Sequence, residues 1–243
     1  MNAKSGSSRP AERGSHELLA NAFERNPVFA HVHAYELYRN WLEAVWCFLN
    51  AAVDPQAYKA CLDRYSPAQG AEYARLLALY IEAVEAMPFR DVLGELFMRL
   101  DVNSARSGQY FTPWSIAEMM ARMQFDRHVF EQTAAEKGVV SVCDPAVGSG
   151  VMLLAFAKVV HDELGRRGTN KLRLYGTDID LRCVHMCRIQ LRMNGLDGFG
   201  RMAGMTAMAG MAGTLEPDKK HATLAVDPGP QLELPMLLPG KVA

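Results

Sequence analysis

The segment from Asp144 to Gly150, which reads Asp-Pro-Ala-Val-Gly-Ser-Gly, combines a carboxylate with two glycines at the end of an apolar run. Glycines allow a tight bend and a close approach of a ligand to the backbone, and the start of a following helix favours bound anionic groups. The spacing lacks the third glycine of a pyrophosphate-binding fingerprint, which weakens a dinucleotide interpretation. The carboxylate of Asp144 instead suits a ligand that carries a positive ammonium group.

A second carboxylate, Asp178, ends the next apolar run, 34 residues after Asp144. At the end of a strand, such a side chain can accept two hydrogen bonds from the hydroxyls of a ribose. Asp180 is interpreted mainly as the N-cap of the helix that follows, a role open to Asp178 as well. S-adenosylmethionine has both an ammonium group and a ribose, so the two carboxylates predict a pocket for this cofactor.

A third segment, residues 108–113 (Gly-Gln-Tyr-Phe-Thr-Pro), precedes these runs and opens a helix expected over 115–123. Thr112 before Pro113 fits an ordinary helix N-cap. The glycine and the two neighbouring aromatic residues are unusual for a helix start alone. Beside a cofactor pocket, the segment would supply backbone and hydroxyl donors to a carboxylate at a helix N-terminus.

Strands and helices must position these three segments. Short β-branched runs at 139–143 and 172–177 predict two strands, and helical patterns at 151–164 and 181–194 follow them. The alternation of strand and helix favours a parallel sheet with crossover helices, so the expected fold class is α/β. The carboxyl ends of both strands would then meet at one edge of the sheet, where such sheets bind nucleotide-like ligands.

The rest of the chain divides by composition. Residues 1–15 are polar and predict a disordered leader, whereas residues 16–102 carry apolar stripes at helical spacing. We therefore expect a helical N-terminal domain over 16–102 and a ligand-binding core over 103–200. Residues 201–243 contain methionines spaced three apart and then several prolines, which predicts a low-complexity and Pro-rich tail.

Composition excludes several classes of protein. With 243 residues, 49% of them hydrophobic, the chain can bury a core, and it has no apolar stretch that fits a membrane span or a signal peptide. The five scattered cysteines favour a reducing compartment, so we expect a cytoplasmic protein. Cys183 and Cys187 share a helix face, but His185 points elsewhere and no second cysteine pair exists, so no metal site is expected.

The charge distribution is less decisive. A net charge of −1 gives no overall signature of nucleic-acid binding. Between Lys158 and Arg201, however, there are nine lysines and arginines against five acids. Such an excess usually belongs to solvated helix faces, and a phosphate-facing patch is the alternative.

The order GQYFTP, then VCDPAVGSGVMLLAFA, then LYGTDID, resembles the N-6 adenine DNA methyltransferase family, which includes modification subunits of type I restriction systems. The run DVLGELF at 91–97 resembles the helix that leads into the family's cofactor motif, and the similar region extends from about Pro88 to Leu196. The resemblance implies a Rossmann-like core that binds S-adenosylmethionine and a flipped-out adenine in DNA as the methyl acceptor. It also implies a restriction-modification or mobile-element association, with DNA and a target-recognition subunit as partners.

The resemblance assigns roles to single residues. Tyr110 and Thr112 would border the methionine end of the cofactor, and Asp178 would bind its ribose. The amino acid group of the cofactor would meet Asp144 and the turn 146–148. The full set of predicted cofactor-binding residues is Gln109, Tyr110, Phe111, Thr112, Asp144, Ala146, Val147, Gly148, Gly150 and Asp178.

One family motif is missing. Family members need an Asn or Asp followed by two prolines and an aromatic residue, which bind the target adenine, and no such tetrapeptide follows Gly150. The nearest match, Asp227-Pro228-Gly229-Pro230, lacks the adjacent second proline and the ring, so Asp227 and Pro228 are weak catalytic candidates. We therefore expect a truncated sheet. Two alternatives stay open: a catalytically inactive cofactor-binding or regulatory subunit that needs a partner, and a methyltransferase for RNA or a small molecule.

Overall fold

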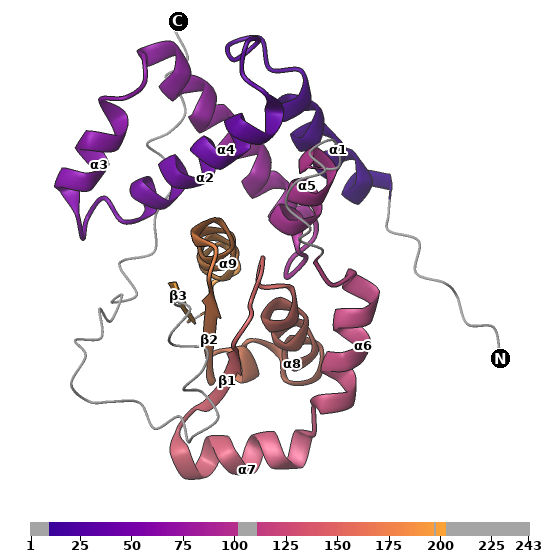
Figure 1. Cartoon of the computed structure of the whole chain (residues 1–243). Coiled ribbons are helices and arrows are strands. Elements are labelled where there is room, and N and C mark those ends of the chain that lie inside the picture. The colour runs from indigo at the N-terminus through magenta and orange to yellow at the C-terminus, as the bar shows by residue number, and fades with distance from the viewer. Residues whose placement is uncertain (1–9, 102–110, 197, 203–243) are drawn as a thin grey trace, which may run out of the picture. The chain divides into compact units, whose positions relative to one another are not determined.

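The computed structural model describes residues 10–101, 111–196 and 198–202, so the Pro-rich tail expected over 201–243 lies almost wholly outside the described residues. The described part is mostly helical, with a small parallel sheet (Figure 1). None of its helices is long and apolar enough to cross a lipid bilayer. Its first helices are α1 (Pro10–Glu24), α2 (Ala34–Leu49), α3 (Pro55–Leu62), α4 (Pro67–Ala86) and α5 (Val92–Asp101). The later elements are α6 (Trp114–Gln124), α7 (Arg127–Lys137), β1 (Val140–Asp144), α8 (Val151–Thr169), β2 (Leu172–Asp178), α9 (Leu181–Met193) and β3 (Gly198–Met202).

The sheet has the strand order β1-β2-β3, and both pairs of neighbouring strands are parallel. α8 connects β1 to β2 and α9 connects β2 to β3, which confirms the expected alternation of strand and helix. In the register of the sheet, Asp144 lies opposite Gly176. The carboxyl ends of β1 and β2 therefore meet at the same edge, and the turns that follow them come together there.

Three elements differ from what the sequence predicts. β3 contains Gly198 and Gly200, which disfavour a strand, and pairing with β2 overrides this preference. α7 was not expected, because it is polar and buries only Phe130 among its described residues. α8 extends to Thr169 past a kink at Gly165, where the backbone leaves helical geometry.

The disordered leader expected over residues 1–15 needs a correction, because α1 already begins at Pro10. Phe23 on this helix is 1% exposed, and Arg99 of α5 forms an ion pair with Glu24. These tertiary contacts stabilise a helix whose polar first turns alone predict disorder. Residues 1–9 lie outside the described residues. For these nine residues, the disordered leader stays a prediction.

The starts of α3 and α4 follow directly from the sequence. The side chain of Asp54 accepts a hydrogen bond from the backbone N–H of Ala57 at 2.9 Å, and Pro55 begins α3. Ser66 and Gln69 cap α4 reciprocally, each side chain bonding the other's backbone N–H. An Asp-Pro or Ser-Pro pair is typical of a helix start, because proline has no N–H to leave unsatisfied.

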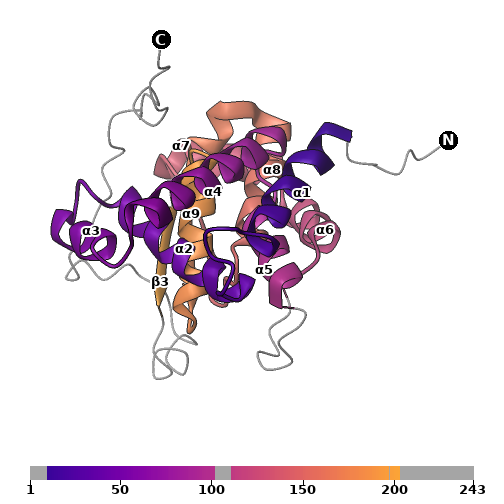
Figure 2. The same ribbon diagram turned by 90° about the horizontal axis from the view of Figure 1, so that it is seen from above.

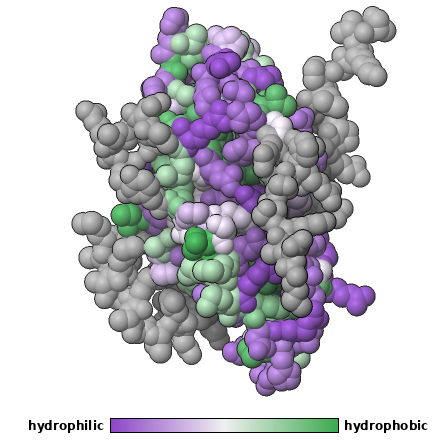
Figure 3. Space-filling view, turned by 90° about the vertical axis from the view of Figure 1, so that its right-hand side faces the viewer, coloured by the Kyte–Doolittle hydropathy of each residue, from purple (hydrophilic) through white to green (hydrophobic). Residues whose placement is uncertain are grey.

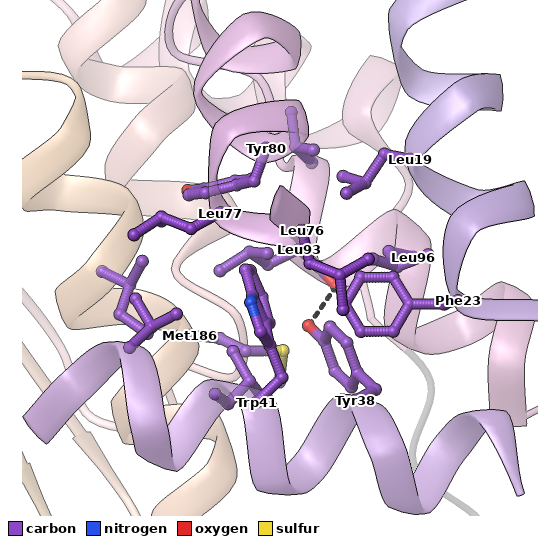
Figure 4. Close-up of a cluster of buried hydrophobic side chains, with 14 of the residues drawn as sticks. Leu19, Phe23, Tyr38, Trp41, Leu76, Leu77, Tyr80, Leu93, Leu96 and Met186 are labelled. Carbon is purple, nitrogen blue, oxygen red and sulfur yellow. Dashed lines mark hydrogen bonds between the residues drawn. The ribbon is translucent and has the colours of Figure 1, made fainter. Parts of the chain in front are cut away.

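The apolar core of the first helices includes one side of α9 (Figure 4). Trp41 of α2 and Tyr80 of α4 are fully buried in it, and so is Met186 of α9. The buried hydroxyl of Tyr38 donates a hydrogen bond to the carbonyl of Leu93 at 2.8 Å, which satisfies a polar group inside the cluster. Viewed from above, α2 passes over α9, in agreement with the contacts between these two helices (Figure 2).

A second apolar cluster lies against the sheet and uses another side of α9. Cys187 and Leu191 of α9 pack there with Leu172 and Leu174 of β2 and with Leu154 of α8. Both clusters therefore depend on the same helix. α9 is buried on two sides, toward the first helices and toward the sheet.

α6 is apolar on two sides, of which one is exposed. Ala117 and Ala121 are buried against α8. The exposed side carries Ile116, Met119, Met120 and Met123, of which Met123 is 79% exposed. Figure 3 looks at this side of the protein, and green apolar surface interrupts the purple hydrophilic surface near its middle.

Candidate functional site

The turn between β1 and α8 is held in a conformation that requires glycine. Gly148 and Gly150 have φ angles of +53° and +97°, which side chains rarely tolerate. The backbone N–H of Val147 donates to the carbonyl of Thr177 at 2.9 Å, and that of Gly150 donates to the carbonyl of Val147 at 2.8 Å. The predicted turn is thus a defined bend, fixed to the end of β2.

Two neighbours enclose this turn. A Cβ atom on Gly148 would lie 3.0 Å from the ring of Phe111, and one on Gly150 would lie 3.1 Å from the sulfur of Cys187. Phe111 in turn contacts Phe97 of α5, with ring centroids 5.2 Å apart. The predicted site residues Phe111, Gly148 and Gly150 are therefore in one place, with α9 beneath the turn.

Asp144 and Asp178 end β1 and β2 and reach the same loops. One oxygen of Asp144 accepts a hydrogen bond from the N–H of Ala146 at 3.0 Å. Asp178 accepts one from the N–H of Gly148 at 2.9 Å and one from the N–H of Asp180 at 2.9 Å. Since a carboxylate oxygen has two lone pairs, both side chains can accept further hydrogen bonds from a ligand.

The site is electrostatically negative. Burial raises the pKa of Asp144, and the nearby carboxylate of Asp178 raises it further. Within the described residues, no lysine or arginine forms an ion pair with either side chain. Burial also raises the pKa of the Cys187 thiol to about 12, with the carboxylates of Asp144, Asp91 and Asp178 among the causes. Uncompensated carboxylates of this kind favour a cationic group.

The helix after β2 begins as the sequence predicted. Asp180 is the N-cap of α9, and its side chain accepts a hydrogen bond from the N–H of Arg182 at 2.9 Å. The alternative role of Thr112, that of an ordinary helix N-cap, is wrong. The N-cap of α6 is Pro113, which makes no side-chain hydrogen bond, because the helix begins one residue later than Thr112 requires. Thr112 is half-buried next to Phe111.

The cysteine pair does not share one environment. Cys183 belongs to the cluster of the first helices, and Cys187 to the cluster against the sheet. The ring of His185 stacks on Trp46, with centroids 5.7 Å apart. In the part of the chain that the structure describes, no three His, Cys, Asp or Glu side chains form a group that could hold a metal ion.

Sequence reasoning missed a buried polar contact behind the turn. Asp91, which precedes α5, accepts a hydrogen bond from the hydroxyl of Ser149 at 2.6 Å and one from the side-chain amide of Gln190 at 2.7 Å. These residues are 58 and 99 positions from Asp91 in the chain, which no local pattern could connect. A weak signal exists in Asp91 itself, because an aspartate directly before a helical run is typical of a helix N-cap.

Gln109 and Tyr110 lie outside the described residues, and so do Asp227 and Pro228. The described site therefore consists of the turn, the two strand-end carboxylates and the side chain of Phe111. Chemically, this arrangement can hold a cationic ligand that also carries hydroxyl groups.

Comparison with known proteins identifies relatives of this region. Residues 89–226, more than half of the chain, match the profile of the N-6 DNA methylase family. Over 110 residues, or 45% of the chain, the sequence is 30% identical to the methylase subunit of the type I restriction enzyme MpnII from Mycoplasma pneumoniae strain ATCC 29342 / M129. These residues correspond to 18% of that relative, so the chain matches less than a fifth of its length.

Solved structures resemble the chain only distantly. A protein of Listeria monocytogenes assigned to the class I S-adenosylmethionine-dependent methyltransferases aligns with a TM-score of 0.48 and 15% identity, over 79% of this chain and 53% of the other. The type I restriction-modification methyltransferase subunit of Streptococcus thermophilus aligns with a TM-score of 0.37 and 14% identity, over 87% of this chain and 42% of the other.

Proposed function

Because the chain belongs to the N-6 DNA methylase family, we propose that it binds S-adenosylmethionine at the carboxyl ends of β1 and β2 and takes part in the methylation of adenine in DNA. The observation that carries this proposal is the placement of Asp144 and Asp178. They flank a glycine turn at neighbouring strand ends, and neither is neutralised by a basic side chain of the described residues.

Each part of the site has a role in this proposal. Asp144 attracts the ammonium group of the cofactor, and the turn 146–150 lies along its amino acid end. Asp178 accepts hydrogen bonds from the ribose with the lone pairs that its backbone contacts leave available. Phe111 and Thr112, with Gln109 and Tyr110 before them, border the methionine end. The three described strands then form part of a Rossmann-like methyltransferase sheet.

The reaction asks little covalent chemistry of these residues. S-adenosylmethionine supplies the methyl group on a sulfonium centre, and transfer to an amine is accelerated mainly by positioning and by exclusion of water. The residues of this chain contribute by fixing the donor: Asp144 holds its ammonium group, Asp178 holds its ribose, and the glycine turn keeps the backbone close to it.

A second candidate function is that of a cofactor-binding subunit that needs a partner for methyl transfer. It is favoured by the absence of an Asn/Asp-Pro-Pro-aromatic motif after Gly150. In this case a partner subunit supplies both the acceptor site and the recognition of a DNA target.

Calorimetric titration with S-adenosylmethionine tests the cofactor proposal. We expect saturable binding by the full chain and binding weaker by about tenfold or more in Asp178→Ala, because hydrogen bonds to a charged carboxylate contribute about 1.5–3 kcal/mol. The matched control is Asp180→Ala, which removes the N-cap of α9 on the same loop and should cost stability but leave the affinity within about threefold. A flat titration of folded wild-type protein would refute the proposal.

A methyl-transfer assay separates the two functions. Tritiated S-adenosylmethionine is incubated with the chain and unmethylated DNA, alone and with candidate partner subunits. Incorporation into DNA by the chain alone contradicts the partner-dependent function. Incorporation only in the presence of a partner supports it, and incorporation into RNA but not DNA contradicts both.

A further inference from the structure

Asp91 is a buried carboxylate without a basic partner among the described residues. It is 3% exposed, and burial raises its pKa. Three hydrogen bonds compensate in part, from the N–H of Gly94 at 3.0 Å and from the side chains of Ser149 and Gln190. Placing a carboxylate in such a position costs free energy, so the contacts that it makes require an explanation beyond packing.

The contacts of Asp91 converge on Ser149, the residue between the two left-handed glycines of the turn. The hydroxyl of Ser149 donates to Asp91 at 2.6 Å, and its carbonyl accepts from the side-chain amide of Gln190 at 2.9 Å. Gln190 also accepts from the N–H of Leu93 at 3.1 Å. Ser149 is completely buried. Asp91, at the start of α5, binds its side chain, and Gln190 of α9 binds its backbone.

The close approach of α5 to the turn depends on Gly94. A Cβ atom at this position would lie 2.6 Å from the hydroxyl of Ser149 and would also collide with the carboxylate of Asp91. Any larger residue would therefore push α5 away from the turn. The start of α5 can therefore pack this closely against the turn only with glycine at position 94.

We propose that Asp91 is a positioning residue for the cofactor turn, which it holds from the buried side while Asp178 holds it from the side of the ligand. This inference rests on the proposed function. Gly148 and Gly150 give the turn many alternative conformations, and fixing Ser149 between them removes most of these before the cofactor arrives. The helical segment before residue 102 thereby contributes to cofactor affinity without contact with the cofactor.

The test compares Asp91→Ala, Asp91→Asn and Ser149→Ala in the full chain by calorimetry with S-adenosylmethionine. Asp91→Ala should weaken binding by about tenfold, and Ser149→Ala by a smaller factor. Asp91→Asn should bind within about threefold of wild type, because an amide can accept from Gln190 and Gly94 and donate to the hydroxyl of Ser149. The double variant Asp91→Ala/Ser149→Ala should bind no more weakly than Asp91→Ala, since both changes remove the same link.

Glu72→Gln provides a control for general loss of stability. Glu72 is another buried carboxylate, 8% exposed, and it accepts a hydrogen bond from Asn26 at 2.6 Å. It lies in the helical part and does not contact the turn. This variant should lose thermal stability but keep the wild-type affinity for S-adenosylmethionine. If Asp91→Ala behaves like Glu72→Gln, with lower stability and unchanged affinity, Asp91 has only a structural role and the inference is overturned.

Hydrogen–deuterium exchange provides a readout that does not depend on the cofactor. Amides of residues 146–151 should exchange at least about tenfold faster in Asp91→Ala than in wild type or Glu72→Gln, because the turn opens locally. Equal exchange in all three proteins overturns the inference. If wild type binds no S-adenosylmethionine and yet these amides respond to Asp91→Ala, the cofactor proposal fails and the positioning of the turn by Asp91 stands.

Discussion

The ring of Phe111 lies directly against Gly148, so close that a Cβ atom on this glycine would come within 3.0 Å of it. The glycine therefore serves two purposes: it permits a φ of +53°, and it leaves room for an aromatic ring from a segment that precedes the sheet. Two segments with different predicted roles, the aromatic run before α6 and the turn after β1, are thus parts of one surface.

Gly148→Ala should destabilise the protein and weaken the binding of S-adenosylmethionine. The left-handed backbone alone costs a side chain about 1–2 kcal/mol, and displacement of Phe111 adds to it. The measurement is urea unfolding together with calorimetry. As a control, Gly70→Ala in α4, where a Cβ has no neighbour within 4 Å, should raise stability by about 0.5–1 kcal/mol. Equal stability of Gly148→Ala and wild type would contradict the packing of Phe111 on the turn.

Met186→Ala should cost about 2–5 kcal/mol, because its fully buried side chain joins α9 to the core of the first helices. Met123→Ala on α6 is the matched control. Met123 is 79% exposed, so its loss should change the free energy of unfolding by less than about 0.5 kcal/mol. Denaturant unfolding followed by tryptophan fluorescence measures both, and similar losses in the two variants would contradict the observed burial.

His185 should make the protein less stable as the pH falls. Burial, with a contribution from Arg188, lowers its pKa from 6.5 to about 4. Between these values the unfolded chain binds a proton that the folded protein does not, so the free energy of unfolding falls with falling pH, by at most about 3 kcal/mol. The variant His185→Phe keeps a ring against Trp46 and should show a flatter stability profile from pH 6.5 to 4. Parallel profiles for the two proteins would exclude this role of His185.

Alkylation of the native protein should distinguish its cysteines. Cys143 is exposed, whereas Cys187 is fully buried and its pKa is raised to about 12. Only thiolates react readily, so iodoacetamide at pH 8 should modify Cys143 well before Cys187. Mass spectrometry of peptides reports the order. In denaturant the two should react at similar rates, and similar rates in the native protein would show that the turn and the cluster against the sheet do not cover the Cys187 thiol.

Much of the sheet region was predictable because it obeys local rules. The strands end at Asp144 and Asp178, within one residue of the expected ends, because β-branched runs stop at polar residues there. The N-cap at Asp180 also follows from its side-chain chemistry and its position before a helical run. Residues whose structure depends on neighbours in sequence were therefore found from the sequence.

The remaining elements depend on contacts between distant segments. β3 is a strand because β2 offers it hydrogen bonds, and the first turns of α1 form because the helix as a whole packs against others. The same holds for Asp91, whose partners Ser149 and Gln190 reach it only in the folded chain. Rules of periodicity and helix capping concern neighbouring residues, so they cannot predict contacts between residues that are far apart in the sequence.

The burial of α9 on two sides has an evolutionary consequence. Its residue Met186 belongs to the core of the first helices, while its neighbour Cys187 belongs to the core against the sheet. An exchange of gene segments between relatives, joined in the stretch between α5 and α6, would combine helices from one parent with an α9 from the other. Such a chimera would fold only if the side chains of α9 that face the first helices were similar in both parents. The first helices and the sheet region with α9 are therefore expected to be inherited together.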